Sequence, residues 1–245
     1  MMKRILLSVF SVIALCALLT SCDAETDNFI ATGDESYFVP AGTGLIQFQV
    51  DSVIYDPIVN GTDRILSSSI WTLDDLDENE GDAFLVSVMG TDSGSVATQR
   101  YIWDFQTSNV TGNQHSSLLD GFSYINLVTP FTERTTWNAL QNADPNLSIN
   151  IAGEPLAINK DWTTARVESI GPYTLPDGST VDAVFVVLTE AENAIELREF
   201  TEIYGKGLGL LERSQRFLDT QQAGSTEPWE VKAENGFTVV MKRLF

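Results

Sequence analysis

The feature that most constrains the fold is a succession of short segments rich in β-branched and aromatic residues, separated by turn signals. These segments cover residues 45–55, 65–73, 83–89, 99–105, 122–128, 162–170, 181–189, 196–204, 208–217 and 237–245. About ten short strands at close spacing are typical of an antiparallel sandwich or barrel. The sequence therefore predicts a mainly β chain with a single antiparallel sheet domain, built as a half-open barrel or a sandwich.

Three details refine this prediction. Leu175-Pro-Asp-Gly178 lies between two of the segments and is a strong turn signal, so a hairpin is expected there. One short helix is expected at residues 136–142, ending before Pro145. Residues 132–161 have the least regular pattern, and we expect a long excursion over one mouth of the sheet, where function is often located.

The N-terminus has the pattern of a secretory signal. Lys3 and Arg4 precede an uncharged apolar run at residues 5–19, which leads into Leu19-Thr-Ser-Cys22. The run is shorter than the ~20 apolar residues that a membrane span needs. Basic, apolar and small residues in this order are typical of a cleaved signal peptide, so we predict cleavage before Cys22.

The four residues ending at Cys22 resemble the lipobox of bacterial lipoproteins, in which the cysteine thiol receives a diacylglycerol group. The resemblance implies that Cys22 is lipidated and becomes the new N-terminus. The alternative is an ordinary secretory signal with a chance cysteine. Because two or more acyl chains anchor a protein stably, a lipoprotein of this kind is expected to stay at its membrane.

The segment after Cys22 is polar, acidic and without apolar periodicity, so it is expected to be a flexible tether. The predicted organisation is a signal peptide at 1–21, an acidic tether at 22–36 and an antiparallel β domain at 37–245. Asp23 resembles the inner-membrane retention signal of enteric bacteria. The acidic residues just after the cysteine, Asp23, Glu25 and Asp27, also resemble the surface-export signal of Bacteroidota lipoproteins.

Charge and cysteine content exclude several functions. Without Lys3 and Arg4 the mature chain has 12 basic against 34 acidic residues, a net charge of −22. This charge opposes nucleic acid and anionic membrane surfaces as partners. Cys16 is lost with the signal and Cys22 is lipidated, so thiolate nucleophiles and cysteine zinc sites are excluded. No cofactor is expected.

Two parts of the chain carry a further resemblance. Tyr37-Phe-Val-Pro40 precedes Phe48-Gln-Val-Asp-Ser-Val-Ile-Tyr55, and the later segment is Glu202-Ile-Tyr-Gly-Lys-Gly-Leu-Gly-Leu-Leu211. They resemble the Tyr-Phe-Pro, Val-Asp-Ser-Ile and Glu-x-Tyr-Ala-x-Gly-Val-Gly-Leu-Val motifs of an uncharacterised Bacteroidota lipoprotein family, although Ile46 stands where that family has tryptophan. The resemblance implies an antiparallel β fold and an outer-membrane lipoprotein, facing the periplasm or the cell surface.

Carboxylates in the segment 74–82 form a candidate calcium site. Asp75, Asp77 and Asn79 have the spacing of the first ligands of an EF-hand loop. However, Glu80 occupies the position that the motif reserves for glycine, and Gly81 comes one residue late. A solvated hairpin loop is therefore favoured over a metal site.

Two further motifs are weak. Gly205, Gly207 and Gly209 could cradle a phosphate if a helix followed them. A strand-like segment follows instead, so a tight hairpin or bulge is favoured. His115, the only histidine, is expected in an exposed polar loop at 108–117, and no Gly-x-Ser-x-Gly turn accompanies it.

Aromatic residues are the remaining candidates. Tryptophans on alternating strands usually belong to the core, which is expected for Trp103. Trp137 and Trp162 flank the irregular segment, so each is predicted either to contact a ligand or to pack in the core.

The sequence contains no catalytic motif, and the predicted function is that of a lipid-anchored envelope lipoprotein with a non-enzymatic β module. Its candidate ligands are a lipid, a peptide, a glycan or an envelope protein. One alternative is a glycan-binding accessory lipoprotein, which requires a row of exposed aromatic rings. Another is a carboxylate-based hydrolase, which requires two carboxyls ~5–10 Å apart and one raised pKa.

Overall fold

The computed structural model describes part of the chain. The described residues are 37, 46–55, 64–75, 84–90, 106–107, 114–119, 122–141, 143–144, 146–151, 154–160, 162 and 164–245. For 64–75, 84–90, 106–107, 114–119, 122–123 and 151, only the backbone is described. The chain divides into two units, Met1–Ala31 and Thr32–Phe245, and the described residues belong to the second. The predicted signal peptide and tether lie outside them.

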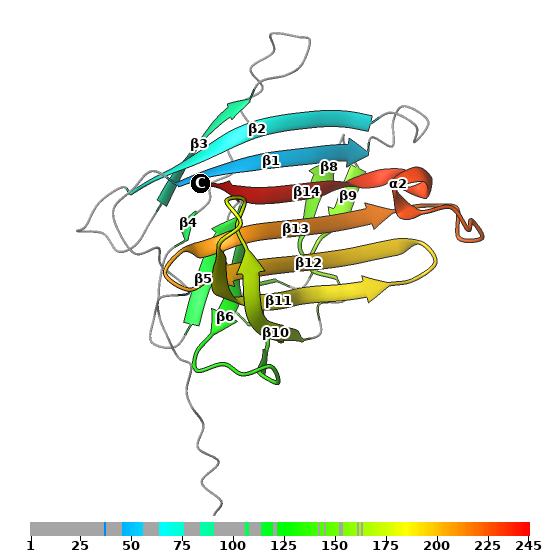
Figure 1. The fold of residues 1–245 in the computed structure, drawn as a ribbon. Coiled ribbons are helices and arrows are strands. Elements are labelled where there is room, and N and C mark those ends of the chain that lie inside the picture. The colour runs from blue at the N-terminus through cyan, green and yellow to red at the C-terminus, as the bar shows by residue number, and fades with distance from the viewer. Residues whose placement is uncertain are drawn as a thin grey trace, which may run out of the picture. The chain divides into compact units, whose positions relative to one another are not determined.

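The described residues form a mainly β fold around one nine-stranded sheet (Figure 1). Its strands, in spatial order, are β3 (Phe84–Gly90), β2 (Arg64–Asp75), β1 (Ile46–Tyr55), β14 (Asn235–Leu244), β13 (Gly209–Asp219), β12 (Glu196–Gly205), β11 (Thr180–Glu192), β10 (Ala165–Thr174) and β7 (Thr136–Trp137). Every neighbouring pair is antiparallel. The prediction of a mainly β, antiparallel domain is confirmed, and the sheet is not closed into a barrel.

Two small antiparallel sheets accompany the large one. The first contains β4 (Gln106–Thr107), β5 (Gln114–Leu119) and β6 (Phe122–Val128), and the second contains β8 (Ser148–Ile151) and β9 (Glu154–Ala157). They lie behind the large sheet in the view of Figure 1. Among the described residues the only α-helix is the single turn α2 (Trp229–Lys232).

The segment 132–161 differs from its prediction. Instead of a helix at 136–142, the two-residue strand β7 is followed by a turn that extends to residue 141. The Asn138 side chain accepts a hydrogen bond from the Leu140 amide at 3.0 Å. Because asparagine readily bonds to nearby backbone in this way, it competes with helix formation and favours a turn.

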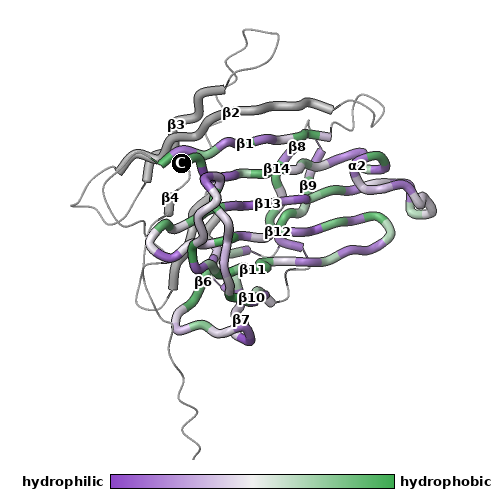
Figure 2. Tube along the Cα trace, in the orientation of Figure 1, coloured by the Kyte–Doolittle hydropathy of each residue, from purple (hydrophilic) through white to green (hydrophobic). Residues whose placement is uncertain are grey.

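Successive side chains of a strand point to opposite faces of the sheet. Figure 2 shows polar and apolar residues interleaved along the strands that it colours, such as β12 and β13. We call the more apolar side the core face. Its buried side chains from the large sheet include Phe48, Val50, Val167, Val184, Val186, Leu188, Phe200, Tyr204, Phe217, Phe237, Val239 and Met241. Tyr124, Leu127 and Leu156, from the small sheets, complete this cluster. Each fully buried side chain of this size contributes roughly 1.5–3 kcal/mol.

The opposite side, which we call the outer face, is covered at one end by α2. A second buried cluster there joins sheet residues to the helical turn and contains Tyr55, Leu197, Leu218, Trp229 and Ala233. Gly236 lies in this part of the sheet with φ of 123°. A Cβ atom on it would stand 2.1 Å from the Phe217 carbonyl oxygen, so only glycine allows the strands to approach this closely.

The β10–β11 hairpin crosses the outer face at the other end. Its turn is at the predicted position, with the Leu175 amide bonded to the Ser179 carbonyl at 2.8 Å and Gly178 at φ of 84°. Irregularities in the pairing, between Val167 and Ser169 and in β11, allow the hairpin to bend. In Figure 1 it passes in front of β12 and β13.

Candidate functional site

Only some of the predicted site residues lie in the part of the chain that the structure describes. Cys22, Asp77, Asn79 and Trp103 lie outside the described residues. Asp75 is the last residue of β2, where only the backbone is described.

His115 and the glycine-rich turn are both located. His115 belongs to β5, so the prediction that it lies in a loop is wrong. Gly207 and Gly209 have φ of 72° and 70° in the turn between β12 and β13, which confirms a tight hairpin.

Trp137 and Trp162 are both partly buried against the core-face cluster. The Trp137 indole donates to the Ile125 carbonyl at 2.8 Å, and the Trp162 indole donates to the Ile158 carbonyl at 2.9 Å. The Trp162 ring stacks on Phe217, with ring centroids 6.4 Å apart. These contacts give both tryptophans a role in holding the irregular segment to the sheet.

The glycan alternative requires a row of exposed aromatic rings. Among aromatic residues whose side chains are described, only Phe245 is exposed. Within the described residues, therefore, no such row exists.

The most unusual group on the core face is an interior polar cluster, which we define as Asn126, Glu202, Tyr204 and Arg213. The Glu202 side chain is 0% exposed and that of Arg213 is 3% exposed. Arg213 donates through Nε to Glu202 Oε1 at 2.6 Å and also contacts it through Nη2. Tyr204 Oη and Asn126 Nδ2 donate to Glu202 Oε2 at 2.6 and 2.8 Å. The carboxylate is thus surrounded by donors from three strands.

Strand geometry explains how these residues meet. Glu202 and Tyr204 are two residues apart on β12, so they share a face. Arg213 lies directly opposite Glu202 on β13. Asn126 is the extra residue of a β-bulge in β6, opposite the step between His115 and Ser116. Because a bulge can redirect a side chain, it allows the Asn126 amide to reach the large sheet.

The electrostatics of this cluster keep its proton donors protonated. Burial raises the pKa of the Tyr204 hydroxyl well above 10, and the Glu202 charge raises it further. Burial is the largest single influence on Arg213 and lowers its pKa, but the charge of Glu202, the interactions with Tyr124 and Tyr204 and the hydrogen bond to Glu202 together outweigh burial, so the pKa is raised. Arg213 therefore remains a cation and Tyr204 remains a hydrogen-bond donor at neutral pH.

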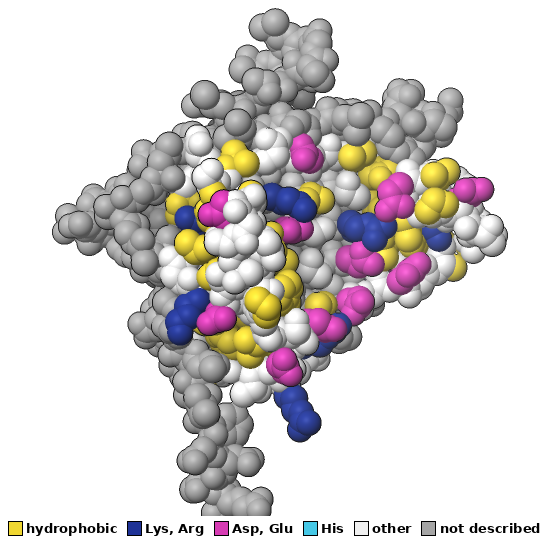
Figure 3. All heavy atoms as spheres, in the orientation of Figure 1, with side chains coloured by type: hydrophobic (Ala, Val, Ile, Leu, Met, Phe, Trp, Pro, Cys, Tyr) yellow, Lys and Arg dark blue, Asp and Glu magenta, His cyan; other side chains and the backbone are white. Residues whose placement is uncertain are grey.

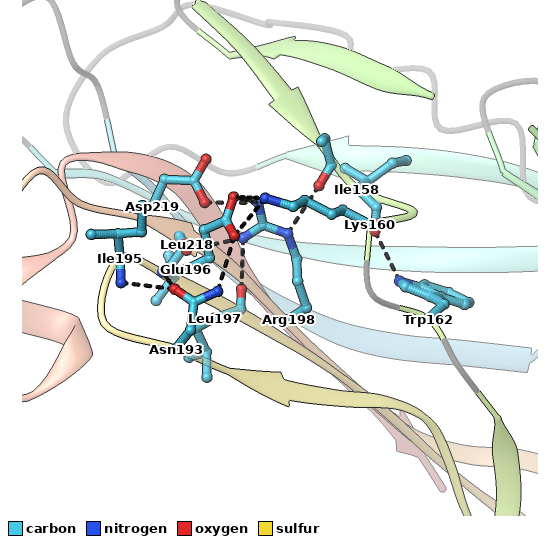
Figure 4. A network of polar contacts seen from close by, with 11 residues as sticks. Ile158, Lys160, Trp162, Asn193, Ile195, Glu196, Leu197, Arg198, Leu218 and Asp219 are labelled. Carbon is cyan, nitrogen blue, oxygen red and sulfur yellow. Dashed lines mark hydrogen bonds and ion pairs between the residues drawn. The ribbon is translucent and has the colours of Figure 1, made fainter. Parts of the chain in front are cut away.

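A second polar group lies at the end of the sheet near the β11–β12 turn (Figure 4). At its centre is Arg198, which is 1% exposed. It donates to the carbonyls of Ala157, Leu197 and Leu218 at 2.9, 2.9 and 3.0 Å. Its Nη2 lies 2.7 Å from Asp219 Oδ1. Arg198 thus connects β9 to β12 and β13.

Two carboxylates with opposite pKa shifts flank Arg198. Glu196 and Asp219 face each other across β12 and β13, and both lie within 4.0 Å of Arg198 Nη2. Burial raises the pKa of Asp219, even though Arg198 opposes the shift. Burial also acts on Glu196, but hydrogen bonds from Lys160 at 2.6 Å and Asn193 at 3.1 Å lower its pKa overall.

The middle of the outer face carries polar side chains, with the half-buried Val240 between Asp51 and Ser214. Asp51 and Thr201 are exposed there, and Ser214 and Thr238 are half-buried. Near α2, Arg216 binds Glu199 at 2.7 Å and Glu230 at 2.6 Å. Figure 3 shows acidic and basic side chains beside one another on this face.

Two features are absent from the described residues. They contain no group of three or more His, Cys, Asp or Glu side chains placed to hold a metal ion. No helix among them is long and apolar enough to cross a membrane.

Comparisons with known proteins provide no family for this chain. No protein-family model matches it, and no curated protein matches it significantly.

Proposed function

We propose that this chain is a lipid-anchored cell-envelope lipoprotein whose β domain is a non-enzymatic binding module. One observation supports a non-enzymatic role for the β domain. Glu202 and Arg198, the charged side chains at the centres of the two buried groups, are bonded to other side chains and to backbone carbonyls. Such groups join the layers of a scaffold, because buried charges need partners.

The anchor part of the proposal rests on the N-terminal sequence. The lipobox-like segment ends at Cys22, and an acidic stretch follows it. The resemblance to Bacteroidota lipoproteins favours the outer membrane, with the β domain on its periplasmic or outer side. The mature charge of −22 favours a domain that stays clear of the anionic lipid surface.

Cell fractionation in a Bacteroidota host tests the anchor. Wild-type protein is expected in the membrane fraction, released by detergent, and Cys22→Ser is expected in the soluble fraction. Cys16→Ser is the matched control, because Cys16 is removed with the signal and its replacement leaves fractionation unchanged. Equal membrane retention of wild type and Cys22→Ser would contradict lipid anchoring at this residue.

For the ligand-binding surface we propose the middle of the outer face, between the β10–β11 hairpin and α2. It is supported by the exposed polar residues Asp51 on β1 and Thr201 on β12, with the half-buried Thr238 and Ser214 on the two strands between them. Native mass spectrometry of the full chain, purified from its own envelope in detergent, is expected to reveal a co-purifying ligand. Thr201→Arg is expected to remove it, whereas Glu154→Arg, at an exposed position on β9, retains it. Retention in both variants would place the ligand elsewhere.

The alternative function, carboxylate-based hydrolysis, would depend on Glu196 and Asp219. Their proximity and opposite pKa shifts are what an acid and its partner carboxylate require. If they were catalytic, Asp219→Asn and Glu196→Gln would abolish hydrolysis of aryl glycosides without unfolding the protein. We expect no hydrolysis by the wild type, since Lys160 and Arg198 already occupy both carboxylates.

A further inference from the structure

The interior polar cluster contains one atom whose bonding is incomplete. Asn126 is fully buried, with 0% exposure, and its Oδ1 has no hydrogen-bond partner among the described residues. Buried side-chain acceptors in folded proteins almost always have a donor, supplied by protein or by an ordered water molecule. This atom therefore indicates a small binding site within the core.

The orientation of the amide is fixed by Glu202. Asn126 Nδ2 donates to Glu202 Oε2 at 2.8 Å. Rotating the amide by half a turn would bring its oxygen against the carboxylate oxygen and lose this hydrogen bond. Oδ1 must therefore point away from Glu202, and it requires a donor from another direction.

The other members of the cluster do not donate to this oxygen. Tyr204 donates its only hydroxyl proton to Glu202, and Arg213 directs Nε and Nη2 to the same carboxylate. Tyr124, two residues before Asn126 on β6, lies in the same region, since its ring contacts Phe200 with the ring centroids 5.4 Å apart.

Size and charge restrict the ligand. Asn126, Glu202, Tyr204 and Arg213 are each 3% exposed or less, so the site is closed to solvent. Glu202 and Arg213 compensate each other's charge, and an additional ion in this interior would have no counter-charge. The ligand must be small, neutral and a hydrogen-bond donor.

We propose that the interior polar cluster binds one internal water molecule, which donates to Asn126 Oδ1. Buried water typically has two to four polar partners, so the second proton of this water is expected to reach another polar atom lining the cluster. The water then lies where Asn126, in the β6 bulge, contacts Glu202 on β12. This site is independent of the proposed function, since it concerns how the covering strands attach to the sheet.

Crystallography of the full chain in detergent, at a resolution that shows ordered solvent, tests the proposal. A solvent peak is expected ~2.7–3.2 Å from Asn126 Oδ1. A protein side chain donating to that atom would overturn the proposal. An empty position, or an amide turned away from Glu202, would also overturn it.

Solution NMR gives an independent readout with variants. Wild-type protein is expected to show long-lived water cross-peaks to the Asn126 amide group. Asn126→Leu abolishes the corresponding cross-peaks to neighbouring β6 amides, whereas Asn159→Leu, the matched change at another buried asparagine, leaves them intact. Absence of the cross-peaks in folded wild-type protein refutes the proposal, and this measurement needs no variant to fold.

Discussion

Replacing Arg213, the cation of the interior polar cluster, tests whether the buried Glu202–Arg213 ion pair stabilises the fold. Arg213→Met leaves the Glu202 carboxylate, 0% exposed, with only two neutral donors, Tyr204 and Asn126. Breaking a buried ion pair from one side costs about 3–5 kcal/mol, since the remaining charge is uncompensated. We expect Arg213→Met to lower the free energy of unfolding by this amount.

The double variant Glu202→Leu/Arg213→Met separates the ion pair from its surroundings. Replacing both partners by apolar groups removes the uncompensated charge. Tyr204 and Asn126 then lose their acceptor, at about 1–3 kcal/mol for each buried donor left unbonded. The double variant is therefore expected to lose much less unfolding free energy than the two single variants lose in sum. The difference is a favourable coupling energy of several kcal/mol.

Urea denaturation followed by tryptophan fluorescence provides the assay, and changes are read from the midpoint at constant slope. Arg216→Met is the matched control on the same strand. Arg216 is 30% exposed and bonds two carboxylates, so its loss is expected to cost only about 0–1 kcal/mol. The interior ion pair would be refuted if the losses of unfolding free energy in the two single variants added up to that of the double variant. It would also be refuted if Arg213→Met lost no more than Arg216→Met.

Three other changes give distinct outcomes. Gly236→Ala is expected to cost at least about 3 kcal/mol in thermal or urea unfolding, because its Cβ meets a carbonyl oxygen, whereas Gly171→Ala, with nothing within 4 Å, is near neutral. Trp162→Phe keeps one aromatic ring but loses the hydrogen bond to Ile158 and part of the indole packing, so the urea midpoint is expected to fall by the equivalent of at least about 0.5–1.5 kcal/mol, and an unchanged midpoint would contradict that bond. The pKa of Glu196 is lowered from 4.5 in the folded state, so its contribution to stability is complete above that pH and is lost as pH falls through the folded value. The stability difference between wild type and Glu196→Gln, measured by urea unfolding at several pH values, should therefore shrink below pH 4.5, and a constant difference would contradict the lowered pKa.

Several elements could be predicted because local signals agreed with the tertiary structure. β6 was expected at residues 122–128 and is observed as Phe122–Val128, and the β10–β11 turn follows its Pro-Asp-Gly sequence. The position of Glu202 on the core face was not predicted, although its alternation with Phe200 and Tyr204 along β12 is a signal that could have predicted it.

Other elements could not be predicted because their causes are not local. β5 has the sequence Gln-His-Ser-Ser-Leu-Leu, which is polar at its start, and it becomes a strand through pairing with β6. β1 lies beside β14, a partner from the other end of the chain. Asn126 reaches Glu202 only because a β-bulge redirects it, and the sequence 122–128 contains no signal for that bulge.

The most direct test of the proposed envelope role is the mass of the N-terminal peptide of the mature protein, extracted from its own membrane. The proposal predicts a peptide that begins at Cys22 and carries a diacylglyceryl group on the cysteine sulfur. A peptide that begins at another residue, or an unmodified Cys22 at the N-terminus, would contradict lipid anchoring of the β domain.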